Sequence, residues 1–198
     1  LDAAWAIGTN AGGLDTGVIA NTTYHVFLIK RTDTGAVDAL FSASATAPSM
    51  PANYDKKRRI GSFVRSGGSI RAFSQDGDTF LWLAPINDVD AANPGTGAVT
   101  RTLSVPTGIV VDALVTFAIA NATTAAIQGL ITALEQSDTV PSATLFDWKT
   151  VTANAGNGVS KRVRTNTSAQ VRTRQSASGA SDTQSVVTHG YIDRRGRG

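Results

Sequence analysis

Residues 24–31 read YHVFLIKR, 32–35 read TDTG, 36–42 read AVDALFS and, after a loop with two prolines, residues 58–73 read RRIGSFVRSGGSIRAF. Two apolar runs around a polar tetrapeptide that ends in glycine are typical of a β-hairpin, because glycine adopts the positive φ that such a turn needs. We therefore expect residues 24–31 and 36–42 to pair as antiparallel strands. The first run is apolar on both faces, which predicts cover on both sides, by a further layer or by a neighbouring subunit.

Short apolar and β-branched runs recur along the rest of the chain, separated by turn residues. Their even spacing is typical of an antiparallel β-sandwich or jelly roll. The sequence thus predicts an all-β fold with one domain over residues 1–198. The alternative is a division into 1–86 and 98–198 around the turn-rich segment 87–97. Further strands are expected at 60–65, 69–74, 79–84, 99–105, 109–119, 127–134, 144–152, 159–165, 169–175 and 186–192, with a helix as the alternative for 127–134, which is rich in Ala and Leu.

The composition is that of a folded protein, with 41% hydrophobic and 17% charged residues in 198. The absence of cysteine excludes disulfides, thiolate metal sites and thiol nucleophiles. No apolar run reaches the roughly 18 residues of a membrane helix, so no membrane insertion is expected. The chain begins at Leu1 and its single methionine is Met50, so we expect a fragment or a processed product of a longer protein.

Basic charge is concentrated near the end of the chain. From Lys161 onward there are eight basic residues and two acidic ones, which predicts an anionic partner or a neighbouring subunit. Arg162 and Arg164, and again Arg172 and Arg174, have the i, i+2 spacing that puts each pair on one face of a strand. The intervening NTSA is typical of a hairpin turn, so the two pairs would form an anion-binding ladder or a subunit contact.

Three further features suggest binding surfaces. Trp5 and Trp148 are candidates for stacking on sugar rings, whereas Trp82 is expected in the core. The run KKRR at 56–59 suits a phosphate or an acidic glycan. Its alternative interpretation, which we favour, is a charged segment that protects the following apolar strand from edge-to-edge aggregation.

The sequence offers little that indicates an enzyme. The two histidines, His25 and His189, are interpreted as packed or interfacial imidazoles, because each lies in an expected strand. Glu135 is the single glutamate, and most aspartates fall in turns, where they cap the backbone. Asp88 and Asp90 offer oxygen ligands for a hard cation, but a solvated loop is the favoured interpretation. We expect no catalytic residues, metal, cofactor or nucleic-acid partner, since no P-loop, dinucleotide or RNA-recognition motif is present.

One long stretch has a family resemblance. GGLDTGVIANTTYHVFLIKRTDTGAVDALFSASATAPSMPANYDKKRRIGSFVRSGGSI, at 12–70, and the closing GYIDRRGRG resemble a module near the C-terminal ends of tail fibre and related virion proteins of tailed bacteriophages and prophages. The similarity extends over roughly residues 1–84 and the last ten residues. The region between them shares only the general pattern of short apolar runs separated by turn residues.

The resemblance implies a non-enzymatic structural protein located in the virion, on a tail fibre or the particle surface. It further implies a homotrimer whose partners are other virion proteins and a host cell-surface glycan or lipopolysaccharide. The module is structural, so no catalytic residue is carried over. Two alternatives are an architectural capsid or tail decoration protein without receptor binding, and a polysaccharide depolymerase, against which the single glutamate argues.

Overall fold

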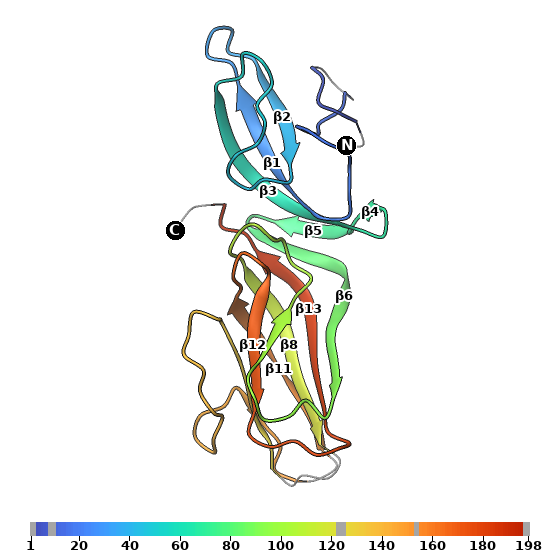
Figure 1. Ribbon diagram of the computed structural model, residues 1–198, viewed down its shortest axis with the longest axis vertical. Coiled ribbons are helices and arrows are strands. Elements are labelled where there is room, and N and C mark those ends of the chain that lie inside the picture. Colours follow the sequence, from blue (N-terminus) through green and yellow to red (C-terminus); the bar gives the residue numbers. More distant parts are fainter. Residues whose placement is uncertain (1–2, 8–10, 122–125, 153–154, 196–198) are drawn as a thin grey trace. The chain divides into compact units, whose positions relative to one another are not determined.

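The computed structural model describes residues 3–7, 11–121, 126–152 and 155–195. These residues form strands and no helix, which confirms the all-β prediction (Figure 1). In chain order the strands are β1 (Thr23–Lys30), β2 (Val37–Ser42), β3 (Lys56–Ser66), β4 (Ser69–Ile70), β5 (Phe73–Asp76), β6 (Thr79–Ala92), β7 (Val99–Thr102), β8 (Asp112–Asn121), β9 (Gln128–Thr132), β10 (Trp148–Lys149), β11 (Ala155–Arg164), β12 (Gln170–Gln175) and β13 (Thr183–Ile192).

The chain forms two compact units. Unit 1 contains residues 1–72 and 193–198, and unit 2 contains residues 73–192. This boundary differs from the division considered at 87–97, because β6 continues through that segment as far as Ala92. Val89 lies in the core of unit 2 with only 7% of its surface exposed, so this part of the segment is a packed strand.

Unit 1 is built on an antiparallel sheet with the strand order β2-β1-β3-β4. The predicted hairpin is confirmed, with Leu28 of β1 opposite Ala39 of β2. One face of β1 packs into the core, where Phe27 and Ile29 contact Tyr54. On the other face Tyr24 is buried but Leu28 is 42% exposed, so the described part of the chain covers this face only in part. The predicted cover by a neighbouring subunit stays a prediction.

Both ends of the chain contribute to unit 1. Leu14 forms a parallel bridge with Phe41 at the free edge of β2. Gly13 is required there, because a Cβ atom at this position would lie 2.4 Å from the Phe41 ring. At the other end Arg195 donates a hydrogen bond to the carbonyl of Ile60 in β3, at 3.1 Å. Arg195 is therefore fixed to the sheet of unit 1.

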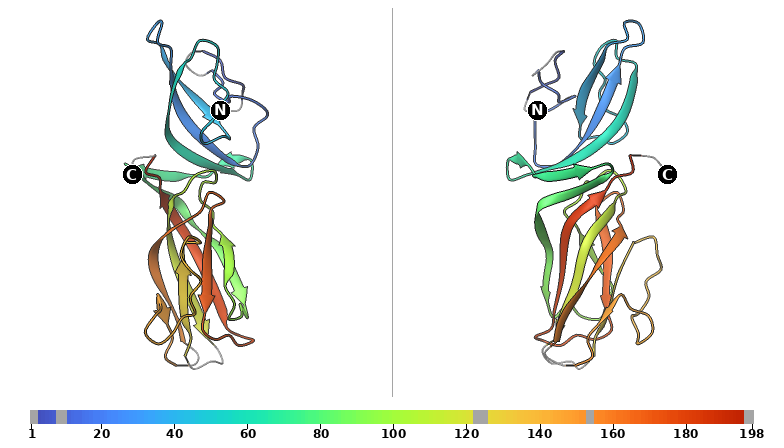
Figure 2. Two further views of the ribbon diagram at one scale, coloured as in Figure 1. Left: turned by 60° about the vertical axis from the view of Figure 1, so that its left-hand side comes forward. Right: turned by 180° about the vertical axis from the view of Figure 1, so that it is seen from behind.

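Unit 2 contains two antiparallel sheets, with the orders β11-β8-β13-β6-β5 and β10-β9-β12-β7 (Figure 2). Phe117 and Ile119 of β8 point into the core, and their exposed fractions are 0% and 1%. A Cβ atom on Gly129 of β9 would lie 2.7 Å from Ile119 Cδ1, so the two sheets approach closely at this glycine. The sandwich-like prediction is confirmed, and β9 is the strand rather than the alternative helix.

The predicted hairpin between the two arginine pairs is wrong. β11, which carries the first pair, hydrogen-bonds with β8 along its length. β12, which carries the second pair, hydrogen-bonds with β7 and β9. The Asn166 side chain organises the turn between them, accepting hydrogen bonds from the amides of Ser168 and Gln170 at 3.0 and 2.9 Å. The turn carries the chain from one sheet to the other.

Candidate functional site

The first arginine pair lies on the outward face of β11. The side chains of Arg162 and Arg164 are 53% and 57% exposed. Arg162 Nε lies 3.4 Å from a carboxylate oxygen of Asp112, and Arg164 Nε lies 3.6 Å from one of Glu135. Because both side chains are more than half exposed, their guanidinium groups are accessible to a ligand. Exposed ion pairs of this kind contribute little to stability.

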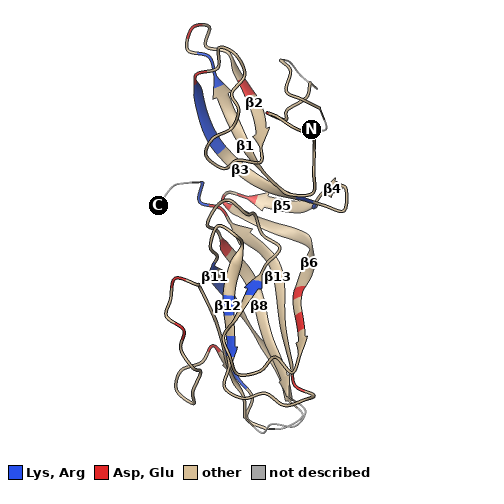
Figure 3. Cartoon of the chain, in the orientation of Figure 1, with Lys and Arg blue, Asp and Glu red and all other residues tan. Residues whose placement is uncertain are grey.

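The second pair lies on β12, in the other sheet of unit 2 (Figure 3). Arg174 forms an ion pair with Asp138 and donates from Nε to the carbonyl of Thr96 at 3.2 Å. Arg172 donates to the carbonyl of Gln136 at 2.6 Å. These contacts hold the segment that follows β9 against β12. The structure therefore does not bring the four predicted arginines together in one ladder.

The two predicted tryptophans pack within their own units. Trp148 is buried, with 5% of its surface exposed. Trp5 donates from Nε1 to the carbonyl of Ala39 at 3.2 Å, and its ring meets Tyr54 edge-on with 5.4 Å between centroids. Both rings support the fold of their own unit. Trp82 is 4% exposed, which confirms its predicted place in the core.

The acidic residues considered as cation ligands belong to β6 rather than to a loop. Asp88 accepts hydrogen bonds from the amide of Ser104 at 2.8 Å and from the hydroxyl of Thr188 at 2.5 Å. Its carboxylate thus bridges neighbouring segments of unit 2. Within the described ranges, no group of three or more His, Cys, Asp or Glu side chains has the geometry to hold a metal ion.

Unit 1 contains a buried polar cluster. His25 Nδ1 lies 2.8 Å from Ser62 Oγ, and Arg59 Nη1 donates to the same hydroxyl at 3.0 Å. Arg59 also forms a two-pronged ion pair with Asp193, including an Nη2 to Oδ1 hydrogen bond of 2.9 Å. The exposed fractions of His25, Ser62 and Asp193 are 0%, 2% and 1%. Arg59 is thus the inward-facing member of the basic run 56–59, whose other three side chains are exposed.

The geometry of this cluster indicates a structural role. A serine nucleophile must reach its substrate, whereas Ser62 is buried and its hydroxyl is already shared by His25 and Arg59. Burial lowers the pKa of His25 to about 4, with a further lowering by the charge of Arg59 and an opposing effect of Asp193. The imidazole is therefore neutral near pH 7, and its interpretation as a packed residue is confirmed.

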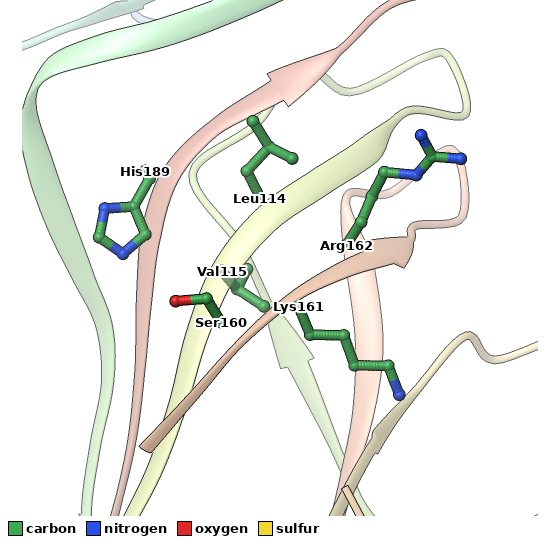
Figure 4. Close-up of a pocket in the computed structure, with 6 residues that line it drawn as sticks. All are labelled: Leu114, Val115, Ser160, Lys161, Arg162 and His189. Carbon is green, nitrogen blue, oxygen red and sulfur yellow. The ribbon is translucent and has the colours of Figure 1, made fainter. Parts of the chain in front are cut away.

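A second polar group lies on the outer face of the five-stranded sheet of unit 2. It surrounds an open, shallow depression of about 370 Å³ (Figure 4). His189 Nε2 lies 2.8 Å from Thr116 Oγ1, which in turn lies 3.3 Å from Ser160 Oγ. Three adjacent strands, β11, β8 and β13, supply this site. The lining residues are Leu114, Val115, Ser160, Lys161, Arg162 and His189.

A β-bulge places His189 in this depression. The pairing of β13 with both β6 and β8 shifts register between Thr188 and Gly190. Glycine is required next to His189, because a Cβ atom on Gly190 would lie 2.1 Å from the carbonyl oxygen of Phe80. Bulges of this kind re-aim a side chain and are frequent beside functional sites. This arrangement was not predicted from the sequence, in which the His-Gly dipeptide is its only signal.

Comparisons of the chain with protein-family models, with curated proteins and with solved structures found no match. Across the residues that the structure describes, no helix has the length and apolar character needed to cross a membrane. Function is therefore inferred from the geometry above and from the resemblance of residues 12–70 and of the closing residues.

Proposed function

We propose that the chain is a non-enzymatic structural protein of a bacteriophage virion, a tail fibre or receptor-binding module that attaches the particle to host-surface glycan or lipopolysaccharide. The main support is the way in which the resembling stretches fold. Residues 12–70 belong to unit 1, and the chain returns to that unit at Asp193. Residues 73–192, most of which share only a general strand-and-turn pattern with the family, form the separate unit 2. This is the arrangement of a framework module that carries an inserted domain.

Two surface features support attachment by an oligomer. The depression in unit 2 is open and shallow, so a single copy would bind a glycan weakly, and several copies acting together would raise the overall affinity. On the outer face of the β1–β2 hairpin, Leu28 and Val37 are 42% and 59% exposed. Apolar side chains gathered on one sheet face suit a subunit contact in the proposed homotrimer.

One observation favours the architectural alternative. The basic excess near the end of the chain is partly matched by the chain's own acidic groups, as in the pair of Arg174 with Asp138. Charge that is matched internally contributes less to the attraction of an anionic glycan. A capsid or tail decoration protein without receptor binding is therefore the second candidate.

Adsorption of the fluorescently labelled chain to cells of susceptible hosts tests the proposal. We expect adsorption that weakens steeply with rising salt, because exposed charges are screened. Periodate oxidation of the cells should abolish it, whereas protease treatment should not. Failure to adsorb to any susceptible host would contradict attachment and favour the architectural role. Release of reducing ends from host polysaccharide would contradict the non-enzymatic assignment.

Light scattering tests the proposed trimer. A stable particle of three times the 20.5 kDa chain mass, at both low and high salt, is the expected result. A monomer at both salt concentrations would contradict the trimer and would mean that the apolar face of the β1–β2 hairpin is not a subunit contact.

A further inference from the structure

The depression on unit 2 combines three kinds of surface on three adjacent strands. In the pairing of β8 with β11, Leu114 lies directly opposite Arg162. In the pairing of β8 with β13, it lies opposite Gly190. Figure 4 shows Leu114 between Arg162 on one side and His189 on the other. An apolar side chain is thus flanked by a cation and by a group of hydrogen-bonding side chains.

Arg162 is free to bind an anion. Its side chain is 53% exposed, and Asp112 is its only ion-pair partner in the described part of the chain, at 3.4 Å from Nε. The terminal guanidinium nitrogens remain available to a ligand. A guanidinium group binds carboxylate and phosphate groups through two parallel hydrogen bonds, which gives both strength and direction.

The opposite side of the depression offers donors and acceptors for hydroxyl groups. His189 uses Nε2 for Thr116, and within the described residues no hydrogen bond involves its other ring nitrogen. Ser160 is exposed and contacts Thr116 at 3.3 Å, so its hydroxyl can still donate or accept. The β-bulge holds His189 in this position. Fixed polar groups of this kind orient a ligand and give it specificity.

Leu114 supplies apolar surface in the lining of the depression, beside these polar groups. Its side chain provides a surface on which one face of a sugar ring can lie. Sites for small molecules commonly combine such apolar surface with a few placed polar groups.

We infer that this depression binds a pyranose sugar with an anionic substituent, either a carboxylate or a phosphate. Arg162 holds the anionic group, Leu114 contacts the apolar face of the ring, and His189 with Ser160 binds the ring hydroxyls. This inference rests on the proposed attachment function and names the ligand class of that function. It assigns recognition to unit 2 rather than to the unit that carries the family resemblance.

Titration of the ¹⁵N-labelled chain with glucuronate, glucose 6-phosphate and glucose tests the site. We expect saturable NMR shift changes at the amides of Leu114, Ser160 and His189 with at least one anionic probe, and weaker changes with glucose. A preference for glucuronate identifies a carboxylate ligand, and a preference for glucose 6-phosphate identifies a phosphate. Equal responses to all three probes, shifts elsewhere in the chain, or no saturable shift would overturn the inference.

Arg162→Gln has a matched control in Arg164→Gln, because both arginines lie on the same face of β11 and have similar exposure. R162Q should weaken binding of the preferred anionic probe by about tenfold or more, since a hydrogen bond to a charged group contributes about 1.5 kcal/mol or more. R164Q should leave the affinity unchanged. Equal effects of the two substitutions would mean that the probe is held by non-specific electrostatic attraction, and would overturn the inference. The spectrum of each variant reports directly whether its fold is retained.

The failure of this inference and the failure of the attachment function give different results. If the wild-type chain adsorbs to host cells and R162Q adsorbs equally, attachment stands and the assigned site is wrong. If the anionic probes bind at the depression while the chain adsorbs to no susceptible host, the site stands and the proposed attachment is wrong.

Discussion

Each unit contains one histidine that contacts a hydroxyl group at 2.8 Å, but the two pairs have opposite surroundings. In unit 1, His25 Nδ1 meets Ser62 Oγ in a fully buried position. In unit 2, His189 Nε2 meets Thr116 Oγ1 at an open depression. The same two chemical groups therefore stabilise the fold in one unit and are accessible to a ligand in the other.

The neighbours of each histidine explain the difference. Beside His25, the charges of Arg59 and Asp193 neutralise each other in a buried pair that joins β3 to the end of the chain. Beside His189, Arg162 is half-exposed and only loosely paired. The buried charges beside His25 are paired with each other, although His25 Nε2 has no hydrogen-bond partner among the described residues. A binding site, in contrast, must leave some of its polar groups available.

The largest effect is expected from Asp193→Asn. It leaves the Arg59 guanidinium, 14% exposed, without its charge partner, which should lower the free energy of unfolding of unit 1 by about 4 kcal/mol. Amide hydrogen exchange in β1 measures this change. Asp33→Asn is the matched control, because it removes the partner of Arg31 in an exposed ion pair and should cause no measurable change. Equal protection of β1 in the two variants would contradict the role of the buried pair.

Acid should destabilise unit 1 through His25. The folded pKa of about 4 lies below the unfolded value of 6.5, so between these values the unfolded chain binds a proton that the folded chain does not. The contribution is fully present above pH 6.5 and falls by about 3 kcal/mol as the pH drops to 4. Urea unfolding followed through the NMR signals of Tyr54 measures it. His25→Gln should flatten this pH dependence, and an unchanged slope would contradict the assignment.

Gly190→Ala tests the bulge that presents His189. The new Cβ atom would lie 2.1 Å from the Phe80 carbonyl oxygen, so the strands must separate, at a cost to unit 2 of about 2 kcal/mol. Thermal unfolding measures the loss, and NMR titration should show that the response to the anionic sugar is also lost. Gly97→Ala, where no atom lies within 4 Å of the added Cβ, should keep both stability and response. Retention of the response in G190A would show that the bulge is not needed for binding.

Local patterns predicted much of the fold. The TDTG turn and its flanking apolar runs predicted the β1–β2 hairpin, and most of the other expected regions formed strands. The expected strand 69–74 is instead divided between β4 and β5, and only Trp148–Lys149 of the expected strand 144–152 is a strand. The apolar setting of Trp82 predicted its burial. These predictions succeeded because turn chemistry and alternation are properties of neighbouring residues, which a single sequence displays directly.

Features that depend on distant residues could not be predicted. The spacing of Arg162 and Arg172 showed the face of each strand but not its partner, and the two strands belong to different sheets. Asp88 looked like a loop residue because its partner Thr188 lies 100 positions away. The same holds for Arg59 and Asp193, 134 positions apart. The bulge at His189 depends on contacts of β13 with two other strands.

Cell adsorption of R162Q beside Ser62→Ala is the most direct test of the division between a structural unit and a binding unit. S62A leaves His25 and Arg59 without a shared hydroxyl and should lower the stability of unit 1 by about 1 to 2 kcal/mol. At a temperature where both variants remain folded, we expect S62A to adsorb to host cells like the wild-type chain and R162Q not to adsorb. Normal adsorption of R162Q, or loss of adsorption in folded S62A, would contradict it.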